Sequence, residues 1–124
     1  MNKLMFTKVW YGGQILFCAD FTDKNNVELD IKVLCAANSI NVEKKATLDK
    51  KQSNTFYNAL IDLDVELDRD YGCSYVTDIP QSNLFLLRGL NVITSHWESN
   101  AADDKAREIY GAMIGVCPEL SKLI

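Results

Sequence analysis

The sequence has few of the residues on which enzyme and metal sites are usually built. Its single histidine, His96, would have to serve any Ser–His, Cys–His or multi-histidine arrangement. Its four cysteines, Cys18, Cys35, Cys73 and Cys117, include no Cys-x-x-Cys pair, the short spacing that places two zinc ligands on one turn. We therefore predict no metal site and no cofactor. The 13 basic residues against 17 acidic ones give a net charge of −4, which argues against nucleic acid as a partner.

The sequence also lacks a long apolar run. The longest uncharged interior stretch, from Val9 to Ala19, is too short and too interrupted by glycine to cross a hydrocarbon core of roughly 30 Å as a helix. Lys8 interrupts the apolar residues near the N-terminus, and no small-residue cleavage site follows. We therefore predict no membrane span, no signal peptide and a cytoplasmic protein. Its cysteines are then expected to be free thiols, with two disulfides in an exported protein as the alternative.

The composition is that of one folded domain. The chain has 124 residues and a mass of 14.0 kDa, of which 48% are hydrophobic and 24% charged residues. These values suffice for one hydrophobic core, whereas two independent cores would each be marginal. We predict a single domain over residues 1–124, without repeats or linkers.

Strand patterns dominate the first third of the chain. Two segments rich in branched and aromatic residues, 3–11 and 14–21, flank Gly12-Gly13 and predict a hairpin. From Val27 to Cys35 apolar residues alternate with charged ones, the period of a half-buried strand. A polar turn over 22–26 joins these segments, so we predict a three-stranded antiparallel meander.

Two periodicities compete in the middle of the chain. A helix over 47–71 is predicted by Thr47 as its cap, by Gly72 as its stop, and by an apolar stripe with helical spacing, Phe56, Leu60, Leu63, Leu67 and Tyr71. Residues 61–68, however, alternate strictly between apolar and acidic, as a strand with an acidic face would. We predict the helix and retain the strand as the alternative.

The last third mixes strands and helices. Residues 73–77 and 90–97 are predicted as strands, and Leu84–Leu87 as a helical turn closed by Gly89. A second helix is predicted over 100–115 with Asn100 as its cap, and Pro118 opens a final short turn. The predicted fold is α+β: an antiparallel sheet of about four to five strands, covered on one face by two principal helices.

The most unusual local feature is a run of five carboxylates within nine residues, here called the acidic ladder: Asp62, Asp64, Glu66, Asp68 and Asp70. Counted from Asp62, the sixth and twelfth positions are Leu67 and Cys73, which excludes a calcium-binding EF-hand loop. The simplest interpretation is a solvated acidic face. The functional one is a docking surface for a cationic protein, because such a partner relieves the repulsion between the carboxylates. Tyr71 or Trp97 would supply an aromatic anchor.

Four lysines form an opposing basic segment, Lys44, Lys45, Lys50 and Lys51. No aromatic residue is interleaved among them, so a stacking platform for single-stranded nucleic acid is not indicated. We interpret the segment as a solvated turn and helix start.

In its small size, acidity and α+β layout, the whole chain resembles the immunity proteins of bacterial toxin–immunity pairs, including those of contact-dependent inhibition. The resemblance implies an acidic surface that binds a basic toxin domain, often a nuclease, and blocks its active site through charge and shape complementarity. The binding residues would be the acidic ladder with Tyr71 or Trp97.

Three other functions are compatible with the sequence. One is a phage or mobile-element inhibitor whose carboxylates imitate nucleic-acid phosphates. Another is a small enzyme that uses His96 with Glu98 or a cysteine, because Glu98 shares the face of His96 on a strand. The third is a structural subunit that forms a homo-oligomer through an apolar patch or a strand edge.

Overall fold

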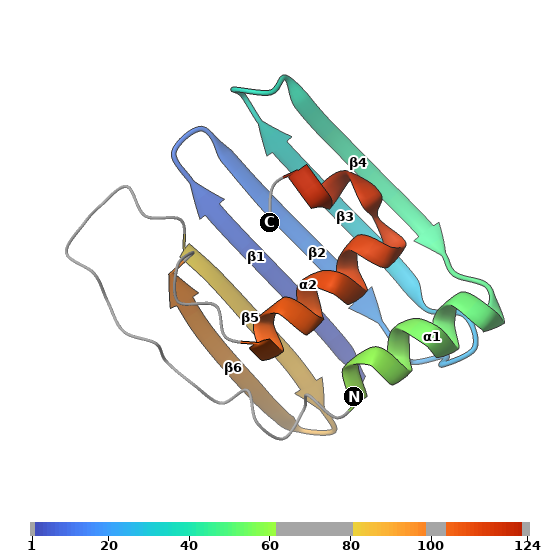
Figure 1. The fold of residues 1–124 in the computed structure, drawn as a ribbon. Coiled ribbons are helices and arrows are strands. Elements are labelled where there is room, and N and C mark those ends of the chain that lie inside the picture. The colour runs from blue at the N-terminus through green and yellow to red at the C-terminus, as the bar shows by residue number, and fades with distance from the viewer. Residues whose placement is uncertain (1, 62–80, 99–103, 123–124) are drawn as a thin grey trace.

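The computed structural model describes residues 2–61, 81–98 and 104–122, with the side chains of all of these except 97, 98 and 104–106. Figure 1 shows a sheet with the helices on one of its faces. In chain order the elements are β1 (Lys3–Trp10), β2 (Gly13–Asp20), β3 (Glu28–Cys35), β4 (Ile40–Thr47), α1 (Lys50–Leu60), β5 (Gln81–Arg88), β6 (Asn91–Glu98), α2 (Asp104–Val116) and the 3₁₀ helix η2 (Pro118–Lys122).

The six described strands form one antiparallel sheet in the order β4-β3-β2-β1-β5-β6. The α+β class, the opening meander and the strand over 90–97 are therefore confirmed. The predicted number of strands, four to five, is too low. After α1 the chain returns to pair β5 with β1, so the first and last hairpins lie side by side in the sheet (Figure 1).

Two strands were not predicted as such. The polar segment after residue 38 contains β4, in which only every second side chain is half-buried. This strand is at the edge of the sheet, where charged residues are the usual composition. Residues 84–87, predicted as a helical turn, belong to β5 instead. Their apolar side chains point alternately to both faces of the sheet, which removes the polar–apolar alternation that marks a strand.

The helix predicted over 47–71 begins later than expected. Thr47 ends β4, and Asp49 is the N-cap: its side chain accepts a 2.8 Å hydrogen bond from the Gln52 backbone N–H, and the Gln52 side chain accepts one from the Asp49 N–H. Residues 62–80 lie outside the described residues, so neither the conflict between helix and strand patterns over 61–68 nor the strand predicted over 73–77 is resolved. The helix predicted over 100–115 is confirmed from Asp104 onward, and the short turn after Pro118 is η2; Asn100 is also outside the described residues.

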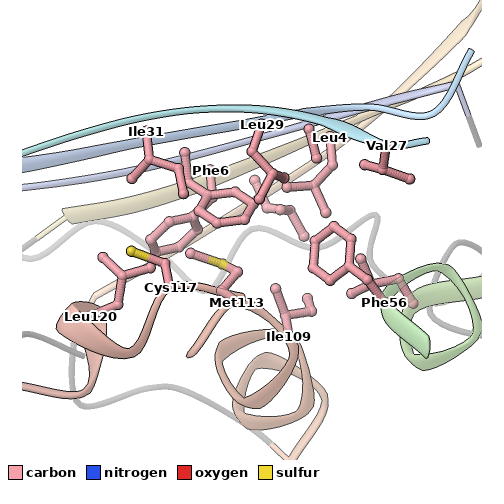
Figure 2. Close-up of a cluster of buried hydrophobic side chains, with 14 of the residues drawn as sticks. Leu4, Phe6, Val27, Leu29, Ile31, Phe56, Ile109, Met113, Cys117 and Leu120 are labelled. Atoms are coloured by element: carbon pink, nitrogen blue, oxygen red, sulfur yellow. The ribbon is translucent and has the colours of Figure 1, made fainter. Parts of the chain in front are cut away.

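One continuous hydrophobic core lies between the sheet and the helices. Figure 2 shows side chains of the sheet, including Phe6 and Ile31, pointing toward Met113 of α2 and Phe56 of α1. All four side chains are at most 2% exposed. Phe56 stacks on Phe21 at 5.5 Å between ring centroids, so α1 is held against the end of β2.

A buried serine also joins α1 to the sheet. The Val27 N–H donates a 3.0 Å hydrogen bond to Ser53 Oγ, whose hydroxyl donates at 3.3 Å to the Leu48 carbonyl. Ser53 therefore satisfies backbone groups just before β3 and just before α1. Ser82 in β5 is equally buried, yet its hydroxyl has no hydrogen-bond partner among the described residues.

The two serines should respond differently to replacement by alanine. Ser53→Ala should lower the free energy of unfolding by about 1–3 kcal/mol, because it leaves the Val27 N–H buried without an acceptor. Ser82→Ala should be close to neutral or slightly stabilising, because it removes an unpartnered hydroxyl. Urea unfolding of both variants measures the difference, and a loss of equal size in the two would contradict the described hydrogen bonds.

The opening hairpin turns at Tyr11-Gly12, one residue earlier than Gly12-Gly13. Gly12 has a φ of +83°, the positive value that this turn position requires. Gly13 is needed for a different reason: a Cβ there would lie 2.3 Å from the Trp10 indole.

Gly13→Ala should therefore displace the Trp10 ring and destabilise the fold by about 1–3 kcal/mol. Gly111→Ala is the matched control, because that exposed position in α2 has open space around it. A helical glycine replaced by alanine should gain about 0.5–1 kcal/mol. Thermal unfolding followed by circular dichroism compares them, and an unchanged midpoint for Gly13→Ala would show that the indole does not pack there.

Candidate binding surface

One face of the sheet, here called the helix-free face, carries none of the described helices. It has an apolar band where polar side chains are the usual composition. Because side chains alternate along a strand, every second residue of all six strands points away from α1, α2 and η2. On the adjacent strands β2, β1 and β5, six of the twelve outward residues are apolar, and five of these six are half-buried: Leu16, Cys18, Met5, Phe85 and Leu87. Cys18, Met5 and Phe85 are direct cross-strand neighbours in one row.

More exposed apolar side chains lie on the same face. Val92 adjoins the band opposite Leu87, whereas Val9 and Leu34 lie on either side of Gln14. Val92 of β6 is 60% exposed, Val9 of β1 52% and Leu34 of β3 48%. Single exposed apolar residues are common on protein surfaces, but a group of them on one face indicates a surface that binds something.

Charged residues occupy one corner of the same face. A hollow of about 490 Å³ is lined mainly by outward residues of β1–β4. Three of them, Asp20, Glu28 and Asp30, are acidic and are here called the acidic corner. Lys3 and Lys45 stand at its margins, opposite Asp20 and Asp30 respectively in the strand register. The corner adjoins the apolar band at Cys18, which lines the hollow as well.

Local hydrogen bonds fix the charge of Asp20. Its carboxylate accepts bonds from the Thr22 hydroxyl at 2.6 Å and the Thr22 N–H at 2.9 Å, and these hold the pKa of Asp20 below its ordinary value of 3.8. Desolvation raises the pKa of the Cys18 thiol, and the nearby Asp30 raises it further. Asp20 is therefore ionised at neutral pH, beside a protonated thiol, and the hollow is lined by three acidic and two basic residues.

The three described cysteines all lie away from His96. Cys18 is on the face of His96 but separated by three strand spacings, about 14 Å. Cys35 and Cys117 are buried on the helix side of the sheet, and desolvation raises the pKa of Cys117 to about 11. All three are free thiols. No described cysteine is therefore placed to pair with the imidazole.

His96 is held by an amide. Its Nδ1 lies 2.8 Å from Asn83 Oδ1 on the neighbouring strand β5. Because an amide oxygen only accepts hydrogen bonds, Nδ1 carries the proton in this pair, which orients the ring. The side chain of Glu98, the predicted partner of His96, is not among the side chains that the structure describes.

Most of the predicted site also lies outside the described residues, namely Asp62, Asp64, Glu66, Asp68, Asp70 and Tyr71. Trp97 belongs to β6, opposite Ser82, but its side chain is not described. The acidic corner was missed, because Glu28 and Asp30 were seen only as the polar half of a strand. The sheet register is what places them beside Asp20.

The basic segment is divided by the fold. Lys44 points to the helix side, where its Nζ lies 3.4 Å from the Val116 carbonyl at the end of α2, while Lys45 borders the acidic corner. Lys50 and Lys51 form the first turn of α1. These four lysines therefore do not form one patch.

The negative charge is concentrated in one segment of the sequence. Residues 62–80 contain six acidic residues and one basic residue, whereas the rest of the chain has eleven acidic against twelve basic residues. The acidic ladder and its neighbours thus account for the net charge of −4.

Comparison with protein-family models, curated proteins and solved structures finds no significant match. Among the described residues no three His, Cys, Asp or Glu side chains group as metal ligands would. None of the described helices has the length and hydropathy that a membrane crossing requires.

The hydrogen bonds to Asp20 predict how its carboxyl group titrates. Its lowered folded pKa stabilises the protein at neutral pH, and this contribution is lost as the pH falls through that pKa. Thr22→Val should raise the Asp20 pKa toward 3.8, whereas Thr47→Val, across the same hollow, should leave it unchanged. Side-chain NMR titration measures both. An Asp20 pKa at or above 3.8 in the unmodified protein would rule out these bonds.

Proposed function

We propose that the chain is a protein-binding inhibitor of the immunity class, which neutralises a bacterial toxin by covering its active site. The observation that carries the proposal is the apolar band on the helix-free face with the acidic corner beside it. An apolar centre with a charged margin is the usual anatomy of a protein–protein interface. Side chains such as Met5 and Phe85 would supply contact area, and the corner would supply orientation.

The distribution of charge favours a cationic partner. The acidic ladder adds a dense negative segment to a chain that is otherwise nearly neutral. A negative field attracts a basic protein and speeds its association. Nucleases are basic at their active sites because their substrates are anionic, so a basic nuclease domain is the proposed target.

The proposal is tested with the polypeptide encoded immediately upstream of this chain. Co-expression should protect cells from that polypeptide, and the two purified proteins should bind each other. Replacing Asp62 and Asp64 with Asn and Glu66 with Gln should slow association by about tenfold or more and flatten its salt dependence. Glu108→Gln, an exposed change on α2, is the control and should leave association unchanged.

His96→Ala separates the inhibitor from the enzyme alternative. An inhibitor should keep its protective effect, whereas an enzyme that depends on the single histidine should lose it. Loss of protection by a folded His96→Ala protein, or binding that is indifferent to the ladder variant, would contradict the proposal.

A further inference from the structure

The two edges of the sheet differ in charge. In the part of the chain that the structure describes, β4 and β6 each have a single neighbouring strand. β4 carries Glu43, Lys44 and Lys45 in its middle, the kind of composition that discourages pairing with another strand. β6 has no charged residue from Asn91 to Trp97 and is rich in β-branched residues. By this criterion β4 is a protected edge and β6 is an edge suited to pairing.

The register shows which backbone groups of β6 point away from the sheet. β5 and β6 are joined by the two-residue turn Gly89-Leu90, so Arg88 and Asn91 form the closing hydrogen-bonded pair. The direction of the hydrogen bonds alternates along an antiparallel strand. The outward N–H and C=O groups therefore belong to Val92, Thr94 and His96, whose side chains point to the helix-free face.

We propose that β6 pairs antiparallel with β6 of a second copy of this chain, which joins the two sheets into one across a two-fold axis. A pairing centred on Ser95 places Thr94 opposite His96 of the second copy and uses the outward backbone groups of both strands. Val92 of β6 lies opposite Leu87 of β5 in the strand register, so the apolar band reaches the β6 edge of the sheet.

The composition of β6 favours a second copy over a foreign strand. Antiparallel pairing of this uncharged stretch with itself brings no like charges together, which self-association through an edge requires. The strand also offers no charge by which it would select a different partner. The acidic corner lies on β2–β4, toward the opposite edge, so this pairing leaves it accessible and does not depend on the proposed function.

Two threonines provide a matched test. Thr94 on β6 and Thr47 on β4 are both exposed and both point to the helix-free face from an edge strand. Light scattering coupled to size exclusion, over a wide concentration range, should give twice the 14.0 kDa mass for the unmodified protein and for Thr47→Lys. Thr94→Lys places two like charges near the two-fold axis and should weaken dimerisation by about tenfold or more.

Hydrogen exchange provides a readout that does not depend on a variant folding. The amides of Val92, Thr94 and His96 in the unmodified protein should become more protected as its concentration rises, while those of β4 should not change. A 14.0 kDa mass at every concentration would overturn the proposal. Equal dimerisation of Thr94→Lys and the unmodified protein would also overturn it, as would dissociation caused by Thr47→Lys.

Discussion

A β-sheet has two faces, and the described helices of this protein cover only one of them. Phe56, Ile109, Met113 and Leu120 close the helix side, where the sheet residues they meet are almost fully excluded from water. Burial of this kind contributes about 1.5–3 kcal/mol for each large apolar side chain, so it is the main source of stability. The side chains on the other face of the sheet have no such described cover.

The helix-free face then raises the question of what contacts it. An antiparallel sheet that meets water on one side usually alternates between apolar and polar residues, as β3 does from Glu28 to Val33. The adjacent strands β2, β1 and β5 depart from that rule, with Met5, Leu16 and Phe85 pointing outward. A surface of this composition suits the protein partner that we propose, and the three carboxylates of the acidic corner suit basic groups on that partner.

The surroundings of the two sheet faces also explain which elements could be predicted from the sequence. The β3 strand was predictable because its two faces have different surroundings, and α2 because its apolar stripe packs on the sheet. β5 was mistaken for a helical turn because Phe85 and Leu87 are apolar on the helix-free face, as Leu84 and Leu86 are on the other. The feature that obscured this strand is therefore the feature that marks the candidate surface. β4 was missed because an edge strand tolerates charge at positions where a central strand does not.

Of the candidate site, the sequence could supply only the part that is local in the chain. The acidic ladder is recognisable because its five carboxylates are nearly consecutive. The acidic corner is not, because Asp20 and Glu28 belong to different strands and become neighbours only through the register of β2 with β3. Tertiary pairing of this kind leaves no short-range signal in the sequence.

We propose that the helix-free face and the acidic ladder together bind a basic protein. The sharpest test is carbodiimide labelling of the carboxyl groups, with and without the polypeptide encoded upstream, because mass spectrometry reads each acidic residue separately. Asp20, Glu28, Asp30 and the ladder should become protected in the complex, while Glu108 on α2 should stay labelled. Protection of Glu108 with unchanged labelling of the corner and the ladder would contradict this proposal.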